Sequence, residues 1–237
     1  MASLRKLVQM EVDIWSDIAC PWCYIGKRRF ESALASFEHA DDVRVTWRSF
    51  ELDPNAPAER SGDLVALLSA KYGMSVQEAT ASQQQLVQTA AAEGLDFRFD
   101  IARSGLTFDG HRVIHLATEH GLADAMKERL MRAYFTEGEL IADHEALVRM
   151  AHELGISRLE TSAVLAGKRF VDDVRGDEAI AQQLGIAAVP TFVVNRKLAI
   201  SGANPPEQLL GLLRQGWEQR PTAAVVDEGA ACAPDGC

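Results

Sequence analysis

Two cysteines three residues apart, Cys20 and Cys23, stand where a predicted strand meets a predicted helix, and this junction constrains the fold most. An alternating apolar run predicts a strand over residues 10–17, and apolar residues at helical spacing predict a helix over residues 24–39. A Cys-x-x-Cys in the first turn of a helix that follows a strand is typical of a reactive dithiol.

A second strand is predicted over residues 43–50, where β-branched and aromatic residues alternate with polar ones. Pro54 and Pro57 follow it and end the extended segment. Because a helix connects the two strands, we expect a βαβ unit with a parallel strand pair.

The middle of the chain is helical in pattern, and most of its helices are predicted to end at a glycine, which adopts a left-handed cap without a Cβ penalty. The predicted helices cover residues 63–71, 75–94, 109–120, 122–136, 143–154 and 157–166. Extended character then returns. A helix over 177–184, strands over 189–194 and 198–201, and a last helix that runs to about residue 219 are predicted, with Asn204 as N-cap and Pro205 at its first position.

Composition narrows the function classes. The 237 residues carry a formal net charge of −10, which disfavours binding to nucleic acid or to an anionic membrane surface. No apolar run is long enough to span a membrane, and the first residues lack the apolar core of a secretory signal, so we expect a cytoplasmic protein. In a reducing compartment, paired cysteines are more often catalytic or metal-binding than structural.

A metal site is not predicted. A closed zinc site needs four ligands, and the cysteines nearest to Cys20 and Cys23 are Cys232 and Cys237 at the far end of the chain. His111 and His115 are four residues apart on a predicted helix, but no third ligand accompanies them. We therefore expect neither a metal nor another cofactor.

Several motifs together resemble a known family. Cys20-Pro21-Trp22-Cys23 after the first strand, Val189-Pro190 before a late strand, and the helical block between them are similar to the DsbA family of thioredoxin-fold proteins. Ser16-Asp17, Tyr24-Ile25-Gly26-Lys27 and Phe50-Glu51-Leu52 resemble its FrnE-like branch, which is related to 2-hydroxychromene-2-carboxylate isomerases and kappa-class glutathione transferases.

The fold class that follows is α/β: a thioredoxin fold with an all-helical domain inserted between its βαβ and ββα halves. The thioredoxin-like domain is expected to be split over residues 10–61 and 168–219, and the helical insertion to cover residues 62–167. Residues 220–237 are small and polar, and we expect a flexible tail that carries the Cys232/Cys237 pair.

The dithiol chemistry assigns a role to each cysteine. Helix N-terminal amides favour the thiolate of Cys20, which attacks a disulfide and forms a mixed disulfide. Cys23, one turn further on, is expected to resolve that intermediate. Pro21 and Trp22 carry no charge, so we expect a couple less oxidising than DsbA at about −120 mV. Trp22 is expected to be exposed and to offer an apolar surface to a partner.

Other residues are candidates for binding or tuning. The resemblance implies a cis Val189–Pro190 bond that faces the dithiol and leaves the backbone of Val189 free to pair with an extended substrate. Asp17 could accept the proton of Cys23, cap the helix, or be a solvated loop carboxylate. His111 either starts an ordinary helix or faces the active-site groove. In the relatives an Asn-Thr commonly precedes this turn, and Leu106-Thr107 stands there instead.

Three functions remain open from the sequence. The leading hypothesis is a thiol–disulfide oxidoreductase or isomerase that acts on protein or peptide thiols and disulfides. The second is a glutathione-dependent isomerase or transferase with a small-molecule substrate, although those relatives typically have Ser at the position of Cys20. The third is a chaperone or partner protein without catalysis. Cys232 and Cys237 form either an accessory redox pair that exchanges with Cys20 or an unconnected dithiol.

Overall fold

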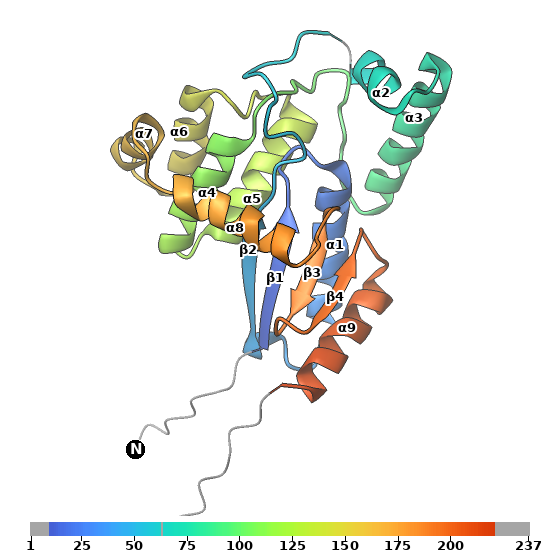
Figure 1. Ribbon diagram of the computed structural model, residues 1–237, viewed down its shortest axis with the longest axis vertical. Helices are drawn as coiled ribbons and strands as arrows, with labels where there is room; N and C mark the ends of the chain where they lie inside the picture. Colours follow the sequence, from blue (N-terminus) through green and yellow to red (C-terminus); the bar gives the residue numbers. More distant parts are fainter. Residues whose placement is uncertain (1–9, 63, 221–237) are drawn as a thin grey trace, which may run out of the picture.

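The computed structural model describes residues 10–62 and 64–220, and its centre is a four-stranded sheet (Figure 1). The strands are β1 (Met10–Ser16), β2 (Val43–Ser49), β3 (Thr191–Val194) and β4 (Leu198–Ser201), in the order β2-β1-β3-β4. β1 and β2 are parallel, as the βαβ pattern predicts, and β3 is antiparallel to both β1 and β4. Segments from the two ends of the chain therefore form one sheet, which confirms the predicted fold class.

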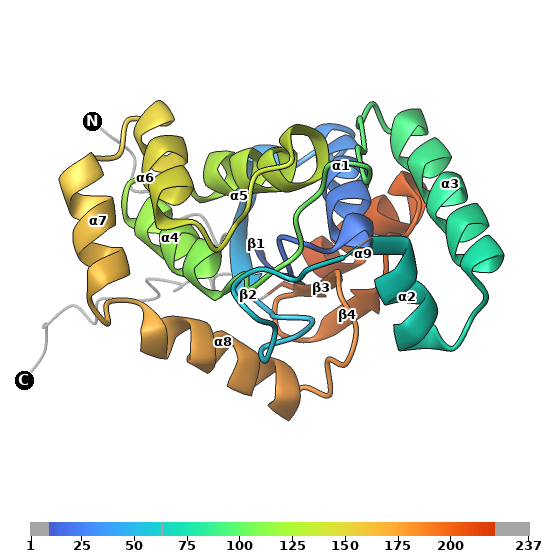
Figure 2. The same ribbon diagram turned by 90° about the horizontal axis from the view of Figure 1, so that it is seen from above.

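Helices pack around this sheet. They are α1 (Pro21–Ala35), α2 (Leu64–Tyr72), α3 (Val76–Ala92), α4 (Phe108–Glu119), α5 (Ala123–Arg132), α6 (His144–Glu153), α7 (Arg158–Ala166), α8 (Val171–Gln183) and α9 (Pro206–Glu218), with a 3-10 turn at Ala40–Asp42 and a π-helical turn at Ala133–Glu137. Figure 2 shows α8 on the side of the sheet opposite α1.

The alternation of side chains along β1 explains this layering. Val12 and Ile14 belong to the core that includes α1 and α9, whereas Trp15 belongs to a separate cluster with Ala181 of α8. Successive side chains of a strand point to opposite faces, so a strand that is apolar on both faces needs helices on both. The indole N–H of Trp15 also donates to the carbonyl of Asp177, at 2.9 Å, and so fixes α8 against the sheet.

The helices between β2 and α8 form two groups in Figures 1 and 2. α2 and α3 lie beside α1, while α4, α5, α6 and α7 pack together near the opposite edge of the sheet. Buried residues of α4 and α5 belong to the same continuous core as β1 and α1. The division into a split domain over 10–61 and 168–219 and an insertion over 62–167 stays a proposal.

The boundaries of the first helix differ from the prediction over residues 24–39. α1 begins at Pro21 because proline has the φ of a first helical residue and Cys20 caps the helix. It ends at Ala35, and Ser36 is its C-cap. The dithiol therefore spans the cap and the first turn of α1. The helix N-terminus is directly at Cys20, whereas the predicted helix began four residues later.

Three later boundaries also differ. α8 begins at Val171 instead of residue 177, and its first turn carries two aspartates, which a helix N-terminus favours. The last helix is capped by Pro205, and Asn204 donates instead to the carbonyls of Ser201 and Gly202, so the predicted Asn204 cap is wrong. The helix predicted over 122–136 changes to π-helical geometry after Arg132.

Gly167 differs in backbone conformation from the other glycines at which helices were predicted to end. Its φ is −106°, whereas the glycines that end the other predicted helices have positive φ values. The buried Arg112 of α4 accounts for this end, because its guanidinium donates to the carbonyls of Val164 and Gly167. A side chain from α4 thus satisfies the free carbonyls at the end of α7.

Candidate active site

Cys20 and Cys23 lie at the N-terminus of α1, where the end of β1 delivers the chain to the helix. Cys20 is the N-cap residue, and its Sγ accepts a hydrogen bond from the backbone N–H of Cys23 at 3.3 Å. Both cysteines are unpaired and buried. An amide donor at a helix N-terminus is a group that stabilises negative charge on a sulfur.

The loop before β3 faces this dithiol. The Val189–Pro190 peptide bond is cis, as the resemblance implied, and the Sγ of Cys20 lies 3.7 Å from the carbonyl oxygen of Val189. Gly26 of α1 permits the approach, because a Cβ at that position would lie 2.7 Å from the Cγ of Pro190. The sequence separation of 169 residues between Cys20 and Val189 is closed by the pairing of β3 with β1.

The surface beside the dithiol is partly apolar. Trp22 is 46% exposed, as predicted, and Leu52, which follows β2, is 45% exposed. Pro21 is the first residue of α1, and Val189 is partly buried. Exposed large apolar side chains next to a buried thiol provide a contact surface for an apolar segment of a partner.

Asp17 is buried beneath the dithiol, so a solvated loop carboxylate is excluded. Its Oδ1 accepts from the backbone N–H of Ile18 at 2.7 Å, and its Oδ2 accepts from that of Leu52 at 2.8 Å. Burial disfavours the carboxylate, but the hydrogen bond with His111, the Leu52 amide and the Lys127 ammonium together hold the pKa of Asp17 below its usual value. Asp17 is therefore a carboxylate at neutral pH.

His111 faces the site from α4 and is almost fully buried. Its Nε2 lies 3.3 Å from Oδ1 of Asp17. Gly110 allows α4 to come this close, since a Cβ there would lie 2.6 Å from Ile18. Burial lowers the pKa of His111 against the opposing hydrogen bond to Asp17, so the ring is neutral at pH 7.

Lys127 of α5 is a residue of this site that the sequence analysis missed. It is 1% exposed, and its Nζ donates to the backbone carbonyl of Ser16 at 2.9 Å. The helical periodicity of the sequence could have indicated it. Lys127 stands three and four residues before Leu130 and Met131 and so lies on the buried face of α5. A lysine on the apolar face of a helix has to find a partner inside the protein.

Cys23 differs from Cys20 in its surroundings. Burial and the neighbouring Cys20 raise the pKa of Cys23 well above its usual value, while Lys127 and the Asp17 backbone amide act in the opposite direction. The deeper sulfur therefore stays a thiol until a positive charge or a change at Cys20 assists its ionisation.

Glu51 is a second buried acid near the dithiol. Its side chain is 1% exposed, its Oε2 accepts from Arg175 of α8 at 2.6 Å, and its Oε1 has no hydrogen-bond partner. Burial raises the pKa of Glu51 to about 7, despite the Arg175 ion pair. Because Asp17 accepts from the amide of Leu52, the two buried acids are linked through one short segment.

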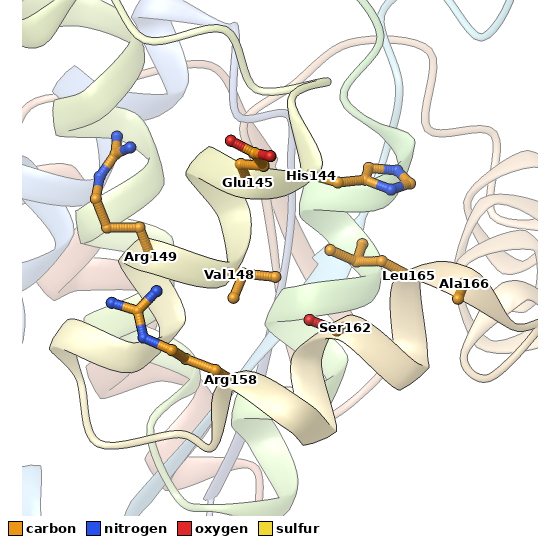
Figure 3. Close-up of a pocket in the computed structure, with 8 residues that line it drawn as sticks. All are labelled: His144, Glu145, Val148, Arg149, Arg158, Ser162, Leu165 and Ala166. Atoms are coloured by element: carbon orange, nitrogen blue, oxygen red, sulfur yellow. The ribbon is translucent and has the colours of Figure 1, made fainter.

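Other features lie away from the dithiol. A cavity of about 460 Å³ lies between α6 and α7. Figure 3 shows its lining residues, which are His144, Glu145, Val148, Arg149, Arg158, Ser162, Leu165 and Ala166. None of the predicted site residues contributes to this lining. Within residues 10–62 and 64–220, no cluster of His, Cys, Asp or Glu could hold a metal ion, and no helix is long and apolar enough to cross a membrane. Cys232 and Cys237 lie outside the described residues.

The structure has a thioredoxin fold with helices between its βαβ and ββα halves and a dithiol at the start of α1. These two features define the class of protein: a dithiol-bearing thioredoxin-fold protein. A family model for the DSBA-like thioredoxin domain matches residues 11–214, so the chain belongs to this family. The crystal structure of a probable DsbA oxidoreductase from Streptomyces coelicolor is 45% identical in sequence, with a TM-score of 0.86 over 97% of this chain and 98% of that chain.

Two more distant proteins are also similar to this chain. The uncharacterized protein YwbO of Bacillus subtilis (strain 168) is 27% identical over 190 residues, which cover 78% of this chain and 86% of that protein. The cytosolic disulfide reductase DsbM of Pseudomonas aeruginosa, solved with glutathione, is 18% identical, with a TM-score of 0.63 over 88% of this chain and 99% of that chain.

Proposed function

We propose that the protein is a thiol–disulfide oxidoreductase that acts through the dithiol of Cys20 and Cys23. The observation that carries the proposal is the position of Cys20 as the N-cap of α1, with its sulfur on the Cys23 amide and beside the Val189 carbonyl. Disulfide exchange requires a nucleophilic thiolate, which a helix N-terminus stabilises, and the adjacent carbonyl can pair with an extended substrate.

The reaction proceeds in two exchanges. The Cys20 thiolate attacks one sulfur of a substrate disulfide, a Cys20–substrate disulfide forms, and the second substrate sulfur leaves as a thiolate. Cys23 then loses its proton and attacks Cys20, which forms the Cys20–Cys23 disulfide and releases the remaining substrate thiol. The substrate gains two electrons and two protons, and the dithiol loses them. In the opposite direction the same steps oxidise a dithiol substrate.

Protein or peptide disulfides are the substrates that we propose. The support is the apolar surface at Trp22 and Leu52 and the Val189 carbonyl, which can accept from the backbone of an extended segment. We also propose a cytoplasmic location, in line with the similar DsbM, which is described as cytosolic. Fractionation of cells that carry the native gene tests this location.

Mixed-disulfide trapping tests the function directly. In a background with Cys232→Ser and Cys237→Ser, the Cys23→Ser variant should accumulate a covalent complex with a disulfide substrate, because the resolving thiol is absent. The Cys20→Ser variant should form no complex and lose insulin-reduction activity. Equal activity of wild type and Cys20→Ser would refute the proposal.

Assays of the same variants distinguish a glutathione-dependent enzyme from direct exchange with protein disulfides. If glutathione is a required co-substrate, then insulin reduction and refolding of scrambled RNase should depend on added glutathione. Activity with dithiothreitol as the only reductant argues for direct exchange with protein disulfides. The fold likeness to a disulfide reductase solved with glutathione makes this assay necessary.

The C-terminal cysteine pair is tested by one further trap. Mild oxidation of the Cys23→Ser variant with Cys232 and Cys237 present should give an internal disulfide to Cys20 if the pair exchanges with the active site. Its absence, with substrate trapping intact, would show that the tail pair is independent.

A further inference from the structure

Lys127 is a buried ammonium with most of its hydrogen-bonding capacity unused. Its side chain is 1% exposed, and its Nζ makes one hydrogen bond, to the carbonyl of Ser16. Among the described residues it forms no salt bridge. An ammonium has three donors and is costly to bury, and here only the longer-range attraction of anions such as Asp17 adds to its single hydrogen bond.

Lys27 of α1 provides an internal comparison. Lys27 and Lys127 both lie 5.8 Å from the centroid of the Trp47 ring, and both are buried. Lys27 forms ion pairs with three carboxylates, from Glu31, Asp124 and Glu128. These pairs neutralise the charge of Lys27 and join α1 to α5. Lys127 differs because its positive charge is not paired in this way.

The hydrogen bond of Lys127 holds its charge on the segment that leads into the dithiol. Ser16, which accepts its hydrogen bond, immediately precedes Asp17 and lies four residues before Cys20. Burial lowers the pKa of Lys127 to about 8, and the anionic forms of Cys23, Asp17 and Cys20 act against this effect, Cys23 most strongly. The other titratable groups around it are His111, which is neutral, and the paired Lys27.

We propose that Lys127, which α5 supplies from the helical segment, is a positioning residue that stabilises the thiolate of Cys23 while this sulfur resolves the mixed disulfide. This inference rests on the proposed function. The Cys23 proton ends on the departing substrate thiolate, Cys23 bonds to Cys20, and the bond between Cys20 and the substrate breaks. The net change is Cys23–SH + Cys20–S–S–R → Cys20–S–S–Cys23 + R–SH. The ammonium gains and loses no proton in this step.

In this proposal the thiolates of Cys20 and Cys23 are stabilised by different groups. Cys20 accepts from an N-terminal amide of α1, its own helix. Cys23 is buried deeper, and the charge that favours its thiolate comes from a different helix, α5. Loss of Lys127 should therefore slow resolution and leave the first attack unchanged.

A single turnover with Ellman's reagent, an aromatic disulfide, resolves these two steps. The test protein carries Cys232→Ser and Cys237→Ser, so that only Cys20 and Cys23 react. The first equivalent of aromatic thiolate reports the attack by Cys20, and the second reports the attack by Cys23. We expect Lys127→Met and Lys127→Gln to slow the second phase about tenfold at pH 7, the factor that corresponds to one pKa unit, with little change in the first.

The alkylation profile of Cys23 gives a readout that a purely structural role would not move. In a Cys20→Ser background with the tail cysteines replaced, Lys127→Gln should shift the midpoint of Cys23 alkylation to higher pH. Lys27→Gln is the matched control, since it removes the other buried ammonium beside Trp47 and should leave the midpoint in place. An unchanged midpoint in folded Lys127→Met and Lys127→Gln would overturn the proposal, as would an equal shift in Lys27→Gln.

A measurement without substitution of Lys127 covers the case in which both variants fail to fold. The pKa of the Lys127 side chain, followed by NMR in a Cys20→Ser protein, should fall when Cys23 is also replaced by Ser. No change would overturn the proposal. Neither this titration nor the alkylation profile uses a protein substrate, so failure of the wild type to reduce insulin would refute the proposed function without deciding the role of Lys127.

Discussion

The carbonyl oxygen of Val189 lies 3.7 Å from the Sγ of Cys20, although 169 residues separate them in the chain. The contact places a backbone acceptor beside the thiol that is expected to attack. It depends on two packing details: β3 pairs with β1, and Gly26 leaves room for Pro190. Changes at either detail should alter activity without any change to the cysteines.

Gly26→Ala should disturb this contact. The added Cβ would lie 2.7 Å from the Cγ of Pro190, so the loop or the helix has to move. We expect a loss of unfolding free energy of roughly 1–3 kcal/mol and reduced insulin reduction. Chemical denaturation and the turnover assay measure both effects. Gly211→Ala is the control, since a Cβ there meets no atom within 4 Å, and it should stabilise the protein slightly.

The reduction potential should lie between those of thioredoxin and protein disulfide isomerase, from about −270 to about −180 mV. The reason is the uncharged Pro21-Trp22 pair, which adds no positive charge to the helix amide that stabilises Cys20. Equilibration with glutathione buffers, followed by tryptophan fluorescence or thiol trapping, gives the value. A potential above about −150 mV would contradict this expectation.

Asp17→Asn should destabilise the protein by roughly 1–3 kcal/mol at pH 7, because an amide cannot accept from all the donors that surround the carboxylate. The pKa of Asp17 lies below its usual value in the folded state. Its carboxylate therefore stabilises the fold above the usual pKa near 3.8, and this contribution is lost as the pH falls through the lower folded value.

Urea unfolding of the Asp17→Asn variant between pH 3 and pH 7 measures this effect. The destabilisation relative to wild type should be largest at neutral pH and should shrink in acid. Asp100→Asn, at an exposed aspartate that pairs with Arg98, should change stability little. A constant difference across this pH range would contradict the assignment of an ionised Asp17.

Glu51→Gln should remove a pH dependence of the opposite sign. The pKa of Glu51 is raised to about 7, so the folded protein binds more protons than the unfolded chain at intermediate pH. The free energy of unfolding of the wild type should consequently fall as the pH rises from about 4.5 to about 7.

The Glu51→Gln variant should lack this fall and should exceed the wild type in stability at pH 8 by a value on the order of 2 kcal/mol. Urea unfolding at several pH values provides the measurement. Glu59→Gln, at an exposed glutamate that pairs with Arg103, should preserve the wild-type fall. A parallel pH profile of wild type and Glu51→Gln would refute the buried acid as its source.

Local sequence signals predicted most of the elements. Alternation and helical periodicity are short-range properties, so they indicated the strands and most helices, and the cap–proline pair Cys20-Pro21 explains the start of α1. Boundaries were less predictable. The last helix, predicted to begin at Pro205 after an Asn204 cap, begins at Pro206, and Asn204 instead donates to carbonyls of the preceding turn.

The candidate site was only partly predictable for a related reason. The two cysteines and the Val189–Pro190 pair were assigned from the residues and the resemblance, but Asp17 and His111 each had several readings. Their burial and mutual contact exclude a solvated Asp17 and place His111 beside it, whereas proton transfer by Asp17 stays a prediction. Gly110 lets α4 reach Ile18 beside them. Lys127 was missed because a single lysine on an apolar helix face does not reveal which loop lies opposite.

The sequence by itself determined the dithiol and its place between a strand and a helix, since both depend on residues close together in the chain. The class of fold followed from the order of the predicted elements and from the family resemblance. The tertiary structure decided what surrounds the dithiol: the carbonyl of Val189, the imidazole of His111 and the ammonium of Lys127. These groups come from separate elements, and burial sets their charges. Burial and long-range packing arise only when the sheet and its helices close around one core.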